Sequence, residues 1–282
     1  MSQPKLKTQT EIYQAAPFLK WAGGKSALLA QFRLHFPGRR SIRRYFEPFL
    51  GGGAVFFHLH PPKSFLFDRN AALIEVYQVV RDDVDGLIEA LRIHQNKEDY
   101  FYAVRAQDPS TLSPAERAAR LIFLNKTCYN GLYRVNRSGQ FNVPFGSYKN
   151  PTICDEFGLH AASAALHDAQ IEVADFEEAV LEAKAGDMIY FDPPYEPLSP
   201  TSSFTKYTSD GFSSADQRRL ARVFAELDER GCKLMLSNSS ASLIYELYQK
   251  FPIHEIRARR QINSRADGRG AITELLITNF TP

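Results

Sequence analysis

Features that would place a protein in a secreted, membrane or fibrous class are scarce in this sequence of 282 residues. Its three cysteines, Cys128, Cys154 and Cys232, are an odd number at wide spacings, which fits neither a disulfide framework nor a zinc site. No run of about 18 apolar residues could span a membrane, and the start of the chain lacks the apolar stretch of a signal peptide. Internal repeats and long low-complexity tracts are missing too. We therefore expect a cytoplasmic protein with reduced thiols and no membrane contact.

An excess of one charge is also missing, because 34 Lys and Arg face 32 Asp and Glu. The positive charges are nevertheless concentrated. Residues 1–44 carry nine Lys and Arg against one acid, residues 116–149 carry six against one, and residues 257–269 carry five arginines against one Asp. Such segments on a nearly neutral chain indicate a localised surface for a polyanion. A merely solvated surface is the alternative for each of them.

Short apolar runs bounded by turn residues predict seven buried strands. They cover residues 45–48, 65–68, 171–175, 188–192, 233–237, 253–259 and 274–279. Helical patterns are found over residues 24–36, 70–80, 214–230 and 239–250. Ser213 or Asp216 is expected to cap the third of these helices. Strands that alternate with helices indicate an α/β sheet.

The stretch between Ala72 and Ala169 breaks this alternation, because it contains no run typical of a central strand. Two amphipathic helices are predicted there, over residues 83–95 and 114–125. Residues 132–136 and 140–144, on either side of a turn with Gly139, predict a β-hairpin. We expect a largely helical insertion with one hairpin.

The tetrapeptide Asp192-Pro193-Pro194-Tyr195 ends one of the expected strands. Ligands of open α/β sheets bind at the carboxyl ends of the strands. The prolines lack an N–H group and stiffen the chain, so their carbonyl groups are left to accept hydrogen bonds. A carboxylate, a carbonyl and an aromatic ring together suit an exocyclic amino group on a flat heterocycle. The alternative is a stiffened turn that the carboxylate only caps.

A second motif, Phe46-Glu47-Pro48-Phe49-Leu50-Gly51-Gly52-Gly53, leads from a strand into a short apolar helix. Its glycines allow close approach of a ligand to the backbone, and this turn of a doubly wound sheet is the usual nucleotide site. Asp68 and Asp175 end the next two strands, where acids could hold a ribose hydroxyl and an adenine amino group. These residues predict an adenosine pocket. A nicotinamide pocket is disfavoured, because Phe56 stands where G-x-G-x-x-G needs its third glycine.

The segment Lys20-Trp21-Ala22-Gly23-Gly24-Lys25-Ser26 ends like a phosphate loop. Leu19 stands where that motif requires its first glycine, so we do not interpret it as one. Its aromatic ring, its glycines and its cation could instead close a pocket around an adenosine that carries a carboxylate.

Residues 125–137 and 141–146 interleave Asn and Arg with aromatic side chains. Asn and Arg are donors to base edges and phosphates, and aromatic rings stack on bases or wedge between them. The pattern favours a nucleic-acid contact. An amphipathic hairpin with an aromatic face in the core is the alternative.

In this order, the motifs closely resemble those of the Dam-type DNA adenine methyltransferases (D12 class), which include the GATC-specific methylases of DpnII-like restriction–modification systems. The resemblance covers about residues 17–280, with matches at residues 18–25, 46–53, 68–70, 129–134, 141–146, 192–195 and 236–238. One departure is Ser147, where many GATC-specific relatives have Arg after the Phe-Gly pair.

The resemblance implies a class I methyltransferase fold, in which residues 1–72 and 169–282 form a doubly wound seven-stranded sheet that binds S-adenosylmethionine. It implies that residues 73–168 form an inserted, mostly helical target-recognition domain that contains the hairpin. The implied catalytic residues are Asp192, Pro193, Pro194 and Tyr195. Those implied around the cofactor are Trp21, Lys25, Phe46, Glu47, Pro48, Phe49, Gly51, Gly53, Asp68, Asp175, Phe176 and Asp192. Those implied to face DNA are Lys20, Tyr129, Asn130, Leu132, Arg134, Asn136, Asn142 and Pro144.

The implied reaction moves a methyl group from S-adenosylmethionine to the exocyclic amino nitrogen of an adenine flipped out of duplex DNA, within GATC. S-adenosylhomocysteine is the product, and no metal is expected. Such an enzyme protects DNA in a restriction–modification system, with an endonuclease for the same site as partner, or works alone. We expect a monomer. A methyltransferase for RNA or protein amides, which more often has Asn in place of Asp192, and a non-catalytic DNA-binding module are the alternatives.

Overall fold

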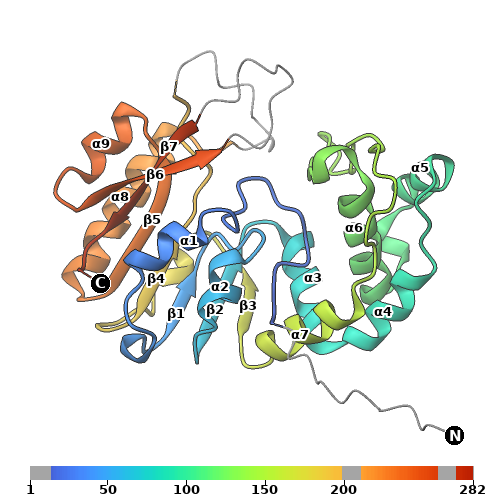
Figure 1. Cartoon of the computed structure of the whole chain (residues 1–282), viewed down its shortest axis with the longest axis horizontal. Helices are drawn as coiled ribbons and strands as arrows, with labels where there is room; N and C mark the ends of the chain where they lie inside the picture. The colour runs from blue at the N-terminus through green and yellow to red at the C-terminus, as the bar shows by residue number, and fades with distance from the viewer. Residues whose placement is uncertain (1–13, 199–210, 260–270, 282) are drawn as a thin grey trace, which may run out of the picture.

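The computed structural model describes residues 14–198, 211–259 and 271–281, and its strands form one sheet in the order β3-β2-β1-β4-β5-β7-β6 (Figure 1). Strand β7 is antiparallel to both of its neighbours, whereas the other pairs are parallel. All seven predicted strands are confirmed, with ends that differ by at most three residues. Their bounds are β1 Tyr45–Glu47, β2 Ser64–Asp68, β3 Gln170–Val173, β4 Met188–Phe191, β5 Lys233–Ser239, β6 Ile253–Arg259 and β7 Ala271–Thr278.

Helices cover both faces of the sheet, as parallel strands require. Along β4, Met188 and Tyr190 join the core on one face and Ile189 and Phe191 join the core on the other, which explains the continuous apolar run. The first face packs against α1 (Leu29–Phe32), α2 (Ala54–Leu59) and α3 (Ala71–Asp82). The second packs against α8 (Ser214–Glu229) and α9 (Ser242–Tyr248). Because β1 to β5 run parallel to one another, their carboxyl ends share one edge of the sheet.

The helix predicted over residues 24–36 is wrong in length. Only Leu29–Phe32 is α-helical, and a 3₁₀ turn, Arg33–His35, follows it. Gly23 has a φ of 79°, and the N–H of Gly24 donates to the carbonyl of Trp21, so the segment before the helix is a series of turns.

The insertion between β2 and β3 contains four helices beyond α3: α4 (Val84–Arg92), α5 (Glu98–Ala106), α6 (Pro114–Thr127) and α7 (Glu156–Leu166) (Figure 1). Ser113 and Glu116 form a capping box at the start of α6. The sequence did not predict α5 and α7. Helix α5 buries only Phe101 and Val104, so its apolar period is weak.

The predicted hairpin is wrong in detail, because the described residues form no strands there. The chain does fold back at Gly139, and the pair Asn142 N–H to Arg134 carbonyl is made, but only isolated bridges occur, at Val135–Phe141 and Cys128–Phe145. The side chain of Asn136 accepts hydrogen bonds from the backbone N–H groups of Ser138 and Gln140 and so holds the turn, while the N–H of Asn136 donates to the carbonyl of Gln140.

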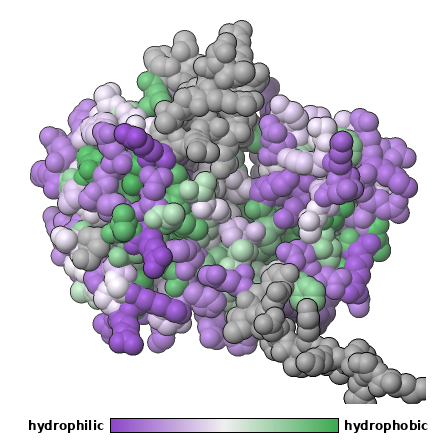
Figure 2. Space-filling view, viewed as in Figure 1, coloured by the Kyte–Doolittle hydropathy of each residue, from purple (hydrophilic) through white to green (hydrophobic). Residues whose placement is uncertain are grey.

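One apolar core joins the insertion to the sheet. Residues of α3, α4, α6 and α7 share a buried cluster with residues of β1 to β5. Gln78 and Arg81 of α3 donate to the carbonyls of Ile171 and Ala169, at 2.9 and 2.8 Å. Hydrophilic residues dominate the outer side of the insertion, at the right of Figure 2. Among the described residues, no helix is long and apolar enough to cross a membrane.

Candidate active site at the carboxyl edge of the sheet

The carboxylate of Asp192 lies directly after β4 and between two donors. Its Oδ1 is 2.7 Å from Nζ of Lys25 and accepts a 2.7 Å hydrogen bond from Oγ of Ser237. Lys25 is almost fully buried, whereas the side chain of Asp192 is 20% exposed, so the carboxylate is the member of the pair that a ligand can reach. The hydroxyls of Ser237 and Tyr190 are 2.9 Å apart. These contacts hold the Asp192 carboxylate in place at the carboxyl edge of the sheet.

The ring of Tyr195 is anchored at its far end. Its hydroxyl donates to Oε2 of Glu274 on β7 at 2.6 Å, and Nζ of Lys25 lies 4.8 Å from the ring centroid. Burial and the nearby Asp192 raise the pKa of Tyr195, so the hydroxyl stays protonated and donates. Burial also raises the pKa of Glu274, while the Lys25 ammonium opposes this.

The two prolines differ in what their carbonyl groups contact. The carbonyl of Pro194 accepts from Nε2 of Gln217 on α8 at 2.9 Å, and the amide of Gln217 is itself held by Asn238. Among the described residues, no donor reaches the carbonyl of Pro193. Pro193 directly follows Asp192 in the chain and is buried, so the carboxylate of Asp192 is the more accessible of the two acceptors.

The turn after β1 shows why glycine occupies it. Gly51 and Gly53 have φ values of 48° and 66°, which L side chains rarely adopt. A Cβ on Gly51 would lie 2.9 Å from Cδ1 of Trp21, so the indole packs directly against this turn. Asp68 accepts from the N–H of Gly51 at 3.1 Å and from the N–H of Asn70 at 2.9 Å. These contacts join the predicted cofactor residues of three segments.

Glu47 lies beneath this turn rather than at its surface. It is buried, it accepts a 2.7 Å hydrogen bond from the hydroxyl of Tyr45, and burial raises its pKa to about 8. Phe46 and Pro48 beside it are buried as well, whereas Phe49 is half-buried. Of these four predicted cofactor residues, only Phe49 is more than slightly exposed.

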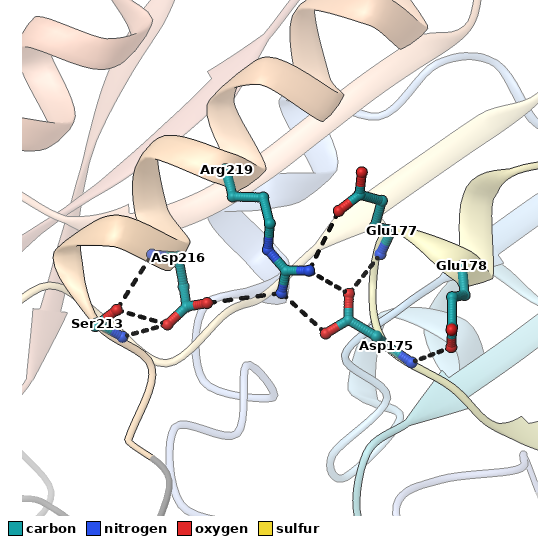
Figure 3. Close-up of polar contacts among 6 residues, drawn as sticks. All are labelled: Asp175, Glu177, Glu178, Ser213, Asp216 and Arg219. Atoms are coloured by element: carbon teal, nitrogen blue, oxygen red, sulfur yellow. Dashed lines mark hydrogen bonds and ion pairs between the residues drawn. The ribbon is translucent and has the colours of Figure 1, made fainter.

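Asp175 and Phe176, at the end of β3, are held by Arg219 of α8 (Figure 3). The guanidinium donates to both oxygens of Asp175, at 3.0 and 2.9 Å. Its Cζ lies 4.2 Å from the ring centroid of Phe176. The Phe176 ring also stacks with Phe49, at 5.5 Å between centroids.

The predicted DNA-facing residues fall into two groups on the insertion. Tyr129 and Asn130 are exposed, and Asn130 with Gly131 forms a left-handed turn at φ values of 55° and 62°. Asn125, fully buried on α6, accepts from the N–H of Lys20 and donates to the carbonyls of Lys20 and Gly131, at 2.8, 2.7 and 3.0 Å. One amide thus joins the Lys20 segment to this turn, and Leu132 follows it half-buried.

The second group lies on the folded-back loop. Nε of Arg134 donates to Oδ1 of Asn142 at 2.6 Å, so these two side chains contact each other. Asn136 uses its side-chain oxygen within the turn. Pro144 is exposed and its carbonyl accepts from the N–H of Tyr129 at 2.9 Å. Arg134 keeps further N–H groups on an exposed side chain.

Comparison of the sequence with known proteins identifies the family of the chain. Residues 21–262 match the model of the D12 class N6 adenine-specific DNA methyltransferase family. The chain is 46% identical to "Type II methyltransferase M1.LlaDCHI" of Lactococcus lactis subsp. cremoris, over 94% of this chain and 95% of the relative. It is 44% identical to "Type II methyltransferase M.MjaIII" of Methanocaldococcus jannaschii, over 95% and 100%. It is 35% identical to "DNA adenine methylase" of Escherichia coli (strain K12), over 92% and 93%.

The chain belongs to the D12 class of N6 adenine-specific DNA methyltransferases. It is therefore a DNA adenine methyltransferase, and its α/β sheet is consistent with the class I methyltransferase fold.

The thiols of this methyltransferase are poorly suited to attack a base. Cys128 is buried, and burial raises its pKa to about 11, so the thiolate is scarce at neutral pH. Among the described residues, no group of three or more His, Cys, Asp and Glu side chains could hold a metal ion. The prediction that no metal takes part stays a prediction.

Sequence reasoning missed several side chains of the site. Ser237 lies within a family match but was given no role, although a Ser-Asn pair at a strand end is a usable signal. Glu274 is a single acid in an apolar strand, which also stands out. Arg219 is one of many charged residues on an amphipathic helix, so nothing in the sequence singles it out.

Proposed function

We propose that this methyltransferase transfers the methyl group of S-adenosylmethionine to the exocyclic amino nitrogen of an adenine flipped out of duplex DNA. The observation that carries the proposal is the pair of acceptors after β4, where the partly exposed carboxylate of Asp192 adjoins a Pro193 carbonyl without a donor among the described residues. An amino group has two N–H donors and needs two such acceptors.

The same acceptors address the chemical difficulty of the reaction. The lone pair of an adenine amino group is delocalised into the ring, which makes the nitrogen a poor nucleophile. Hydrogen bonds to Asp192 and Pro193 favour a pyramidal nitrogen, and the ring of Tyr195 offers a stacking face that offsets part of the cost of flipping. Positioning of the two reactants then supplies much of the rate enhancement. Asp192 need not act as a general base, because the methylated amine can lose its proton to solvent.

The residues around the β1 turn fit the proposed cofactor. The close approach of Trp21 to the glycine turn and the carboxylate of Asp68 provide a ring and an acceptor for ribose hydroxyls, and the buried ammonium of Lys25 adds positive charge beside them. When bound, S-adenosylmethionine supplies the electrophilic methyl group on its sulfonium. Glu47 supports the turn from below and does not need to contact the cofactor.

We propose that the insertion reads DNA through Tyr129, Asn130, Leu132, Arg134, Asn142 and Pro144, together with Lys20 from the segment before β1. The exposed Tyr129 and Asn130 would fill the gap left by the flipped base, and GATC is the proposed site by resemblance to the family. Asn136 is already used within the turn, so its role would be to shape the loop. Restriction protection, as in the systems of type II relatives, or a solitary role both remain compatible with this chemistry.

The test is methyl transfer from labelled S-adenosylmethionine to three short duplexes: one with GATC, one with a scrambled site, and one with GATC already methylated on both strands. Label on the unmethylated GATC duplex alone supports the full proposal. Label on other adenine sites would reject GATC and point to Ser147, and the Ser147→Arg variant would then be assayed on the same duplexes. Absence of label on any DNA would reject the proposal and favour RNA or protein substrates.

A further inference from the structure

Arg219 forms a contact network that the proposed chemistry does not yet use. In Figure 3 its guanidinium lies between the carboxylates of Asp175 and Asp216, with Glu177 close to one of its nitrogens. Nη1 of Arg219 donates to Oδ1 of Asp175 and, at 3.2 Å, to Glu177, while Nη2 donates to Oδ2 of Asp175. Such a two-pronged contact fixes the plane of a carboxylate, which a single donor cannot do.

The network leaves one acceptor site on Asp175 available. Its Oδ1 accepts from Arg219 and, at 3.1 Å, from the N–H of Glu177. Its Oδ2 accepts only from Arg219 among the described residues. Each carboxylate oxygen has about two lone-pair directions, so Oδ2 can still accept one hydrogen bond from a ligand.

Arg219 also covers Phe176, the residue after Asp175. Its guanidinium lies over the buried ring of Phe176, and that ring contacts both Phe49, from the β1 turn, and Phe212, which lies just before α8. Arg219 therefore ties α8 to the end of β3 and, through Phe176, to the turn after β1. Arg218 offers a contrast, because its partner Glu246 lies at 3.3 Å in an exposed pair on the helix surface.

We propose that Arg219 is a positioning residue that orients Asp175 to recognise the adenine amino group of the methyl donor. This inference rests on the proposed function, since it assumes that S-adenosylmethionine binds along the ends of β1, β2 and β3. Arg219 acts through Asp175 and touches no reacting atom. It therefore affects which nucleoside the cofactor site accepts rather than the rate of the chemical step.

The experiment measures binding by isothermal titration calorimetry, with S-adenosylhomocysteine and with its hypoxanthine analogue, in which an oxygen replaces the amino group. We expect the wild-type protein to prefer the adenine compound by about tenfold or more, as for a hydrogen bond to a charged group. In Arg219→Met the preference should fall to about threefold or less, chiefly through weaker binding of S-adenosylhomocysteine. Arg219→Lys should also lose preference, because Lys keeps the charge without the planar fork.

Arg218→Met is the matched control and should keep the wild-type preference, and thermal melting of each variant checks that it is folded. An unchanged preference in both Arg219 variants would overturn the inference, and so would equal weakening of both ligands. No preference in the wild-type protein would also overturn it. Failure of the wild-type protein to bind S-adenosylhomocysteine at all would instead overturn the proposed function on which the inference rests.

Discussion

Replacement of Asp192 by Asn separates the catalytic part of this carboxylate from its structural part. The variant keeps the shape of the side chain and an oxygen that can accept from Ser237, which now donates at 2.7 Å. It removes the negative charge that lies 2.7 Å from the buried ammonium of Lys25. The substitution should therefore slow methyl transfer and destabilise the folded protein for two different reasons.

The kinetic effect follows from loss of a fixed anion next to the amino nitrogen. Removal of one preorganised group that stabilises developing charge costs about 3–4 kcal/mol, which is roughly a hundredfold to a thousandfold in rate. We expect Asp192→Asn to lower the single-turnover rate by at least about a hundredfold. DNA affinity should stay within about threefold of wild type, because the phosphate contacts proposed for the insertion do not involve Asp192.

The effect on stability follows from the burial of Lys25. Loss of one partner of a buried ion pair costs about 3–5 kcal/mol. A loss at or just below the lower end of this range applies here, since the Asp192 side chain is 20% exposed and the carbonyl of Gly23 still accepts from Nζ of Lys25. We expect the free energy of unfolding to fall by about 2–3 kcal/mol in Asp192→Asn, and the added Lys25→Met change to restore part of it.

Rapid-quench methyl transfer, DNA binding by fluorescence anisotropy and urea unfolding measure the three quantities on the same preparations. The double variant should regain stability without regaining activity. A single-turnover rate within about tenfold of wild type for folded Asp192→Asn would refute the catalytic assignment. Recovery of activity in the double variant would show that the single variant had failed only through instability.

Three further changes test other contacts of the structure. Glu47 has a folded pKa of about 8 against 4.5 in the unfolded chain, so its contribution to stability is present below about pH 4.5 and is lost as the pH rises toward 8. Urea unfolding at pH 5 and at pH 8 should show that the wild type loses more stability than Glu47→Gln, by at most about 1.4 kcal/mol for each pH unit. Equal losses in the two proteins would contradict the raised pKa. Asn125→Ala leaves the buried polar groups near Lys20 without partners and should lower the unfolding free energy by about 2–4 kcal/mol, so a loss under about 1 kcal/mol would reject its bridging role. Glu274→Gln weakens the anchor of Tyr195 and should lower kcat/KM about fivefold to tenfold, with no further loss when Tyr195→Phe is added; additive losses in this double variant would reject the anchor.

The strands could be predicted because a strand buried on both faces needs apolar side chains in succession, as Met188 to Phe191 show. Gly51 and Gly53 could be assigned to a tight turn for a similar reason, since only glycine adopts such backbone angles readily. Properties that local residues dictate were therefore accessible from the sequence.

Properties that depend on contacts between residues far apart in the sequence could not be predicted. Glu47 has the position of a ligand residue, yet its burial follows from packing around β1 that no local pattern encodes. Asp175 was expected to hold an adenine amino group, but its pairing with Arg219, which is 44 residues away, could not be predicted from the sequence. The chain folds back at Gly139 as predicted, but beside the turn it makes a single isolated bridge, at Val135–Phe141, and the residue pattern alone did not reveal that the pairing stops there.

The shared core of sheet and insertion limits how DNA specificity can be exchanged between relatives. Helices α3 and α7 contribute buried side chains to the same cluster as the strands. A graft that replaced the whole insertion would therefore exchange part of this shared core together with the residues proposed to contact DNA. A smaller cluster, formed by Phe101, Val104, Phe123, Leu124, Cys128, Phe141 and Val143, lies under the folded-back loop. Junctions placed after Ile122 of α6 and before α7 would exchange the folded-back loop and leave the buried residues of the shared cluster in place. Evolution of new target sites in such a scaffold is then expected to proceed by replacement of loop residues rather than by exchange of whole modules.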